Sequence, residues 1–145
     1  MSILAFDLGG SSLKAGLLGA DGATIAAASV PLGFEEDRSG RSEADPALWW
    51  KALGQAAGKM SAAAAADPVE AISLCAFTRT QVFLGEGGRV IRPAITFRDS
   101  RGLGPAEEAL ARPGVRDHAD ARHLNPFHPL ARLLWLACHE PEAWA

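Results

Sequence analysis

With 145 residues, 48% of them hydrophobic and 21% charged, the chain has the composition of one globular domain that can bury a core. Its formal net charge of -3 argues against nucleic acid or an anionic membrane as the main partner. There is no apolar stretch of membrane-spanning length and no basic signal-peptide region, so we expect a cytoplasmic protein. Cys75 and Cys138 lie in apolar runs, and we expect both to be reduced residues of the core.

The first part of the sequence predicts three strands joined by tight turns, followed by a helix. Residues 2–7 and 12–19 are strand-like, and Asp21-Gly22 is a hairpin turn signal before a weaker strand over 23–31. Residues 34–42 are polar and predict a surface loop. Asp45 suits a helix N-cap and Pro46 the first helical position, so we expect a helix over about 46–65.

The rest of the sequence predicts a mixture of strands and helices. The apolar run 71–77 predicts a buried strand parallel to the first, and polar residues 78–81 follow at its carboxyl end, where open α/β sheets favour ligands. We expect a hairpin around 85–88, a strand over 94–97 and a short helix near 104–112. An irregular stretch over 114–129 and a helix over about 129–139 complete the prediction.

The turn between the first two strands has the residue types of a phosphate site. Gly9 and Gly10 permit φ > 0 and let a phosphate approach the backbone closely, while Ser11 and Ser12 add hydroxyl donors. Asp7 is too negative to contact phosphate directly, but it could hold Mg²⁺, through water, that does. The alternative interpretation of the same residues is an ordinary hairpin turn with a solvated aspartate.

Other chemical motifs are absent from the sequence. The dinucleotide fingerprint Gly-x-Gly-x-x-Gly does not follow the first strand, and no Gly-Lys-Ser/Thr P-loop, Cys-x-x-Cys pair or Gly-x-Ser-x-Gly elbow occurs. His118, His123 and His128 are spaced by five residues, which matches no helical face. We interpret them as loop histidines in preference to a metal site.

Four segments, taken in order, resemble the N-terminal domain of the FGGY-family carbohydrate kinases, and most of all the xylulose kinases among them. That domain has the α/β, actin-like or ribonuclease H-like fold, with a mixed sheet and flanking helices. Residues 7–14 look like the family's first phosphate motif, and residues 42–50 look like its loop-to-helix transition. Residues 89–101 resemble the segment that ends in Trp-x-Asp-x-Arg, and residues 133–142 resemble the helix that ends in His-Glu-Pro-Glu.

The resemblance implies a kinase that transfers the γ-phosphate of ATP, with Mg²⁺, to a hydroxyl of a small sugar or polyol resembling xylulose. In that interpretation Asp7 orients the metal. The residues that would meet the phosphates are Gly9, Gly10, Ser11, Ser12 and Lys14. The residues that would bind the sugar are Thr78, Arg79, Thr80, Asp99 and Arg101.

The resemblance also implies that residues 1–145 are a truncated N-terminal lobe. The family's catalytic aspartate and its adenosine-binding lobe fall beyond the position matched by Ala145, so no catalytic residue is expected here and the chain alone should be inactive. A lobe of this kind would leave apolar surface exposed, which would favour a homodimer.

Two departures from the family pattern leave the sugar open. Gly10 stands where the family commonly has threonine. Residues 78–81 stand where xylulose kinases have Gln-Met-His-Gly and glycerol kinases have Gln-Arg-Glu; Arg79 matches the glycerol-kinase arginine, but Thr80 replaces the glutamate. Two alternatives follow: a non-catalytic sugar-binding module or relic, and another actin-fold kinase that shares only the phosphate hairpin.

Overall fold

The computed structural model describes residues 1–144, which form two compact units. The first unit contains Met1–Gly33 and Pro46–Phe77. The second contains Phe34–Asp45 and the chain from Thr78 onward. The chain therefore crosses between the units at three points in the sequence.

The first unit is built on a four-stranded mixed sheet in the order β3-β2-β1-β6. Strands β1 (Ser2–Leu8), β2 (Ser12–Gly19) and β3 (Thr24–Pro31) are antiparallel, and β6 (Val69–Ala76) pairs with β1 in parallel. At the β2–β3 turn Gly22 has φ +81°, and the Asp21 carboxylate accepts a hydrogen bond from the Ala23 N–H at 2.9 Å. The predicted strands, turn and parallel pairing are thus confirmed.

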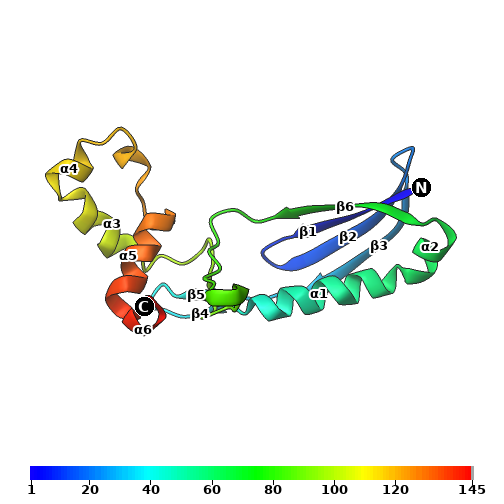
Figure 1. Ribbon diagram of the computed structural model, residues 1–145, viewed down its shortest axis with the longest axis horizontal. Coiled ribbons are helices and arrows are strands. Elements are labelled where there is room, and N and C mark those ends of the chain that lie inside the picture. Colours follow the sequence, from blue (N-terminus) through cyan, green and yellow to red (C-terminus); the bar gives the residue numbers. More distant parts are fainter. Residues whose placement is uncertain (145) are drawn as a thin grey trace. The chain divides into compact units, whose positions relative to one another are not determined.

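Helix α1 (Pro46–Lys59) lies along one face of this sheet (Figure 1). Alternate residues of β1 and β2 point toward it, and Leu13 and Leu17 are fully buried. Burying each of these leucines contributes about 1.5–3 kcal/mol. The single helix expected over 46–65 is interrupted: Met60, only 2% exposed, has φ −106° and ψ 3°, and α2 (Ser61–Ala66) begins after it.

Strand β6 is not buried, contrary to the prediction. It forms an edge of the sheet, and its Ile72 and Leu74 side chains are 70% and 62% exposed. Helix α1 packs on β2 and β3 and leaves β6 open. Cys75 on this strand and Cys138 in the second unit are both exposed and free, so their expected core positions were also wrong.

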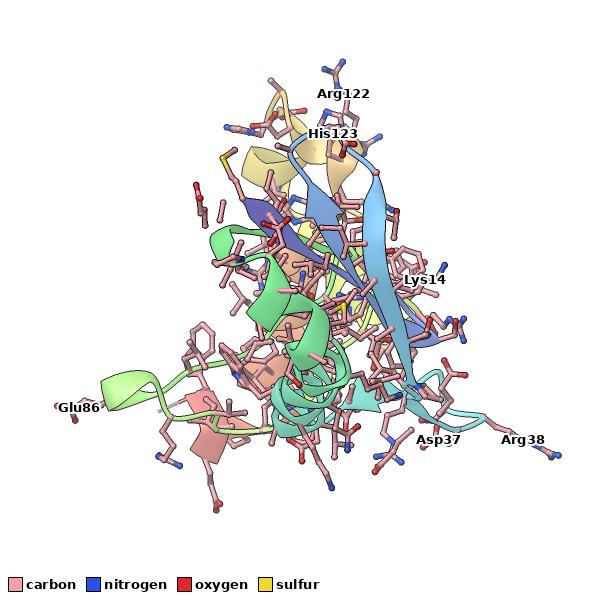
Figure 2. The ribbon with its side chains drawn as sticks, turned by 90° about the vertical axis from the view of Figure 1, so that its right-hand side faces the viewer. Lys14, Asp37, Arg38, Glu86, Arg122 and His123 are labelled. Carbon is pink, nitrogen blue, oxygen red and sulfur yellow. The ribbon has the colours of Figure 1, made fainter. Side chains whose placement is uncertain are left out.

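The second unit begins with a small antiparallel sheet in the order β4-β5-β7. Its strands are β4 (Glu35–Glu36), β5 (Ser42–Ala44) and β7 (Ala94–Ile95). The predicted surface loop over 34–42 is therefore wrong at its end, because β5 is buried throughout. Figure 2 shows Asp37 and Arg38 extending outward at the turn between β4 and β5.

The remainder of the second unit is mostly helical. Its helices are α3 (Leu103–Leu110), α4 (Pro113–Arg116), α5 (Pro129–His139) and α6 (Pro141–Trp144), with 3-10 turns η1 (Glu86–Gly88) and η2 (Ala121–His123). Helix α5 confirms the prediction, whereas α4 and η2 lie in the stretch that we expected to be irregular. Among residues 1–144 no helix has both the length and the apolar character needed to cross a membrane.

The loop histidines have structural roles consistent with their interpretation. His128 caps α5, because its Nδ1 accepts a hydrogen bond from the Leu130 N–H at 3.1 Å. His118 accepts in the same way from the Asp120 N–H at 3.2 Å. In the part of the chain that the structure describes, no three His, Cys, Asp or Glu side chains cluster as a metal site would require.

Candidate functional site

The turn between β1 and β2 is tight at Gly9. The Gly9 N–H donates to the Ser12 carbonyl at 3.0 Å, and a Cβ at residue 9 would lie 3.0 Å from the same oxygen. Neither Gly9 nor Gly10 has positive φ. The left-handed freedom that we expected these glycines to supply is therefore unused, and what favours glycine at residue 9 is the close approach of the Ser12 carbonyl.

The same turn presents donors on a fixed frame. The Leu8 carbonyl accepts from the Phe77 N–H at 3.1 Å, and the Ser11 carbonyl accepts from the Leu32 N–H at 2.9 Å. Within residues 1–144, the backbone N–H groups of Gly10 and Ser11 donate to no acceptor. Together with the two serine hydroxyls, they form a small group of donors of the kind that binds anionic oxygen.

Asp7 and Lys14 lie directly opposite each other on β1 and β2. Both are exposed, whereas their neighbours Leu8 and Leu13 are buried, so the charged pair is on the sheet face opposite α1. Figure 2 shows the Lys14 side chain extending away from the sheet. Lys14 therefore lies on the same sheet face as Asp7, the predicted metal ligand.

In the second unit, residues 78–81 and residues 95–99 lie side by side. Gln81 and Ile95 exchange backbone hydrogen bonds at 3.0 Å in both directions, and the Thr80 hydroxyl accepts from the Phe97 N–H at 3.1 Å. Arg79 has φ +58° and is the one non-glycine residue with positive φ among those described. Because Thr78 and Arg79 are exposed, the turn presents their side chains to solvent.

Asp99 is 1% exposed, and both of its carboxylate oxygens accept hydrogen bonds. Its Oδ2 accepts from the Ser42 N–H at 2.9 Å, and its Oδ1 accepts from the Arg101 N–H at 3.0 Å. The Arg101 guanidinium adds contacts at 2.7, 3.0 and 3.2 Å. A carboxylate has about four acceptor positions, so little capacity is left for the sugar hydroxyls that we expected Asp99 to bind.

Arg101 connects Asp99 to Glu43 and to an aromatic ring. Its guanidinium carbon lies 4.1 Å from the centre of the Trp135 ring, and its Nη2 donates to Glu43. Burial opposes the charge of Arg101, but the hydrogen bonds to Asp99 and Glu43 outweigh burial and raise the pKa of Arg101. Arg101 is therefore a partly buried cation whose charge is paired within the unit, and its role as a sugar ligand remains a prediction.

Glu43 is the centre of this charge network. It is 6% exposed, and its Oε1 accepts from both Arg92 and Arg101, which lie 49 and 58 residues away in the sequence. Arg92 also pairs with Glu140, with an Nε–Oε2 distance of 2.7 Å. The network thus joins β5, the segment before β7 and the end of α5.

Glu43 should make the stability of the unit depend on pH. Burial raises the pKa of Glu43, but Arg101 and Arg92 outweigh this effect, and the pKa falls below the usual 4.5. The stabilisation is therefore fully present above the unfolded-state pKa and is lost as the pH falls through the lower folded-state value. We expect the free energy of unfolding, measured with urea, to fall less steeply with decreasing pH in Glu43→Gln than in the wild type below about pH 4.5. The two slopes should differ by at most about 1.4 kcal/mol per pH unit.

Asp37 also contributes to the pH dependence of stability, in the wild type and in Glu43→Gln alike. The hydroxyl and backbone of Ser39, with Arg41, lower the pKa of Asp37 to about 2, so some pH dependence will persist in Glu43→Gln. The difference between the two proteins isolates Glu43. Identical slopes for wild type and variant would show that the Glu43 carboxylate is not held in its ionised form by the arginines.

Arg132 is a second buried cation, and the sequence gave no indication of its position. It is 1% exposed in α5 and donates to backbone carbonyls of Arg79, Ile95, Thr96 and Asp99, and to Gln81 Oε1. Burial lowers its pKa to about 10. No role for Arg132 follows from the sequence, and its contacts with the four carbonyls and with Gln81 are what reveal one.

A comparison with protein families identifies the chain. The model of the N-terminal domain of the FGGY family of carbohydrate kinases matches residues 2–145. The chain belongs to this family. The match covers the β1–β2 hairpin of the first unit and the residues of the charge network in the second.

Curated relatives and solved structures agree with this assignment. Xylulose kinase of Escherichia coli K12 is 29% identical over 139 residues, covering 96% of this chain and 29% of that protein. The crystal structure of a "xyloylose kinase" from Brucella ovis is 30% identical with a TM-score of 0.84, covering 99% of this chain and 30% of that one. Xylulose kinase from Rhodospirillum rubrum has a TM-score of 0.87 at 23% identity, covering 99% and 31%.

These matches confirm the predicted fold class, the actin-like α/β fold with a mixed sheet and flanking helices. The chain spans about 29% of the length of the curated relatives that it matches. The domain boundaries that we predicted from the sequence, and the roles of the individual site residues, remain predictions.

Proposed function

We propose that this FGGY domain supplies the phosphate and sugar contacts of an ATP-dependent kinase that phosphorylates a small sugar or polyol. The observation that carries the proposal is the β1–β2 turn, where Asp7, two unpaired N–H groups and two serine hydroxyls are held on a rigid frame. Phosphoryl transfer depends mainly on positioning and on neutralising charge, and donors of this kind serve both needs.

The residues of the turn fit a magnesium-bound phosphate. Mg²⁺ prefers oxygen ligands, and it is usually held by one or two carboxylates together with substrate phosphates and water. Asp7 would hold the metal, and the free N–H groups of Gly10 and Ser11, with the hydroxyls of Ser11 and Ser12, would meet the phosphate oxygens. Lys14, which shares the sheet face of Asp7, would add positive charge. The metal would supply charge neutralisation on the transferred group.

For the sugar, we propose that Thr78, Arg79 and Thr80 make the direct contacts. Their support is the strained turn at Arg79, which presents polar side chains at the end of a strand. Asp99 and Arg101 are better suited to hold this region in place than to bind hydroxyls directly, because their charges are already paired. The domain carries no convincing general base, so we assign no catalytic residue.

A ligand panel observed by amide NMR tests the proposal on the 145-residue chain. We expect magnesium pyrophosphate to shift the amides of Gly10 and Ser11, and a pentulose or polyol to shift those of Thr78–Thr80. Millimolar dissociation constants, worth about 4 kcal/mol, suffice for detection. We also expect no sugar-dependent ADP release by this chain alone, since it spans 29% of the length of relatives that are kinases.

Each result has a distinct meaning. Sugar shifts without pyrophosphate shifts would favour a non-catalytic sugar-binding module. Pyrophosphate shifts without any sugar shift would favour a kinase that shares only the hairpin. If neither ligand perturbs the named amides at saturating concentration, the proposed function is wrong for this domain.

A further inference from the structure

Arg132 differs from Arg92 and Arg101 in the kind of group that it contacts. Arg92 and Arg101 pair with carboxylates of Glu43, Glu140 and Asp99. Among residues 1–144, Arg132 forms no salt bridge, and all of its hydrogen-bond acceptors are uncharged oxygens. Burying a cation in this way is costly, so an arrangement that retains it needs a strong set of hydrogen bonds.

The acceptors of Arg132 come from residues 78–81 and residues 95–99, the two segments that lie side by side in the second unit. The Nη1 of Arg132 donates to the Arg79 carbonyl, to Gln81 Oε1 and to the Ile95 carbonyl, the last at 3.4 Å. The Nη2 donates to the carbonyls of Thr96 and Asp99, the latter at 3.3 Å. One rigid guanidinium therefore spans residues 79–81 and residues 95–99, which are far apart in sequence.

Arg79, one of the residues whose carbonyls Arg132 contacts, also has a strained backbone. Arg79 has φ +58°, a conformation that costs a non-glycine residue free energy and persists only where its surroundings enforce it. The hydrogen bond from Arg132 to the Arg79 carbonyl is one such constraint. Helix α5 in turn fixes Arg132, because His128 caps the helix one turn earlier.

We propose that Arg132 is a positioning residue that sets the relative geometry of the 78–81 turn and the 95–99 segment, and through them the sugar contacts. The inference rests on the proposed function where it concerns sugar, since Thr78, Arg79 and Thr80 are its proposed ligands. Arg132 itself, at 1% exposure, does not reach the sugar. It acts through the backbone carbonyls that it binds.

The test compares Arg132→Met and Arg132→Lys with Arg92→Met in the 145-residue chain. Arg92→Met is the matched control, because Arg92 is a buried arginine of the same unit that pairs with carboxylates and not with residues 79–81. Hydrogen exchange is read at the Gln81 and Phe97 amides, which bond to Ile95 and Thr80, and is normalised to Leu32 in the first unit.

We expect Arg132→Met to raise exchange at Gln81 and Phe97 by about tenfold or more, while Arg92→Met leaves that ratio near the wild-type value. Arg132→Lys, with a compact ammonium in place of the planar fork, should fall between wild type and Arg132→Met. If Arg132→Met does not fold, Arg132→Lys carries the comparison. An unchanged ratio in the folded variant, or an equal rise in Arg92→Met, would overturn the proposal.

Sugar binding separates positioning from simple stabilisation. We expect the folded fraction of Arg132→Met to bind the sugar at least about tenfold more weakly, with pyrophosphate binding at the hairpin unchanged. Loosened segments with unaltered sugar affinity would overturn the positioning role. If wild type binds no sugar at all, the proposed function fails, yet the exchange ratio still decides whether Arg132 holds the two segments together.

Discussion

Replacing Asp99 by asparagine is expected to cost the domain about 3 kcal/mol or more of unfolding free energy. The carboxylate is 1% exposed and accepts from Ser42 and from Arg101. Removing its charge leaves Arg101, whose side chain is 13% exposed, with one anionic partner, Glu43, and breaking a buried pair typically costs about 3–5 kcal/mol. Urea unfolding at neutral pH measures the loss.

Asp120→Asn is the matched control for Asp99→Asn. Asp120 is an acid of the same unit with a 79% exposed side chain, and its replacement should change stability by less than about 0.5 kcal/mol. A loss below about 1 kcal/mol in Asp99→Asn would contradict the structural role. If Asp99→Asn stays stable but loses sugar binding, the direct hydroxyl contact predicted from the sequence is the better interpretation.

Replacing Asp7 by asparagine is expected to abolish the magnesium dependence of phosphate binding. In the wild type, Mg²⁺ should strengthen pyrophosphate binding by about tenfold, because a carboxylate-held cation neutralises the phosphates. The asparagine variant keeps the shape of the side chain but loses the anionic ligand. Titration of pyrophosphate with and without Mg²⁺, followed at the Gly10 and Ser11 amides, measures the coupling.

The fold should tolerate the Asp7 change. Asp7 is exposed and faces Lys14, and a cross-strand pair of opposite charges contributes only about 0.2–1 kcal/mol. Asp21→Asn is the control, since Asp21 is an exposed carboxylate at another turn of the same sheet. Magnesium coupling that survives in Asp7→Asn, or that disappears equally in Asp21→Asn, would exclude Asp7 as the metal ligand.

The β1–β2 hairpin was predictable because its signals are local. Two strand-like runs flank Gly9-Gly10, and strand alternation separates the buried Leu8 and Leu13 from the exposed Asp7 and Lys14. The position of β6 was only half predictable. Its apolar run correctly indicated a strand parallel to β1, but hydrophobicity cannot say whether a strand is covered, and Ile72 and Leu74 are exposed.

The sugar region was less predictable, because its geometry depends on partners remote in sequence. Asp99 and Arg101 were singled out by resemblance to a motif, yet their charges are paired within the unit. Nothing in the sequence near Glu43 predicts that it is buried, because the residues before it, 35–42, are mostly charged or polar. A charged side chain such as Glu43 becomes buried only when groups distant in the sequence, here Arg92 and Arg101, compensate the loss of water.

By itself, the sequence determined strands β1, β2, β3 and β6, helices α1, α3 and α5, the turn at Gly9 and the family to which the chain belongs. These follow from periodicity, turn residues and motif order, which act over a few residues at a time. Only the tertiary structure decided that Glu43, Arg92 and Arg101 form one network and that Arg132 joins residues 79–81 to 95–99. Such contacts require the chain to fold before the groups meet, so no local pattern encodes them.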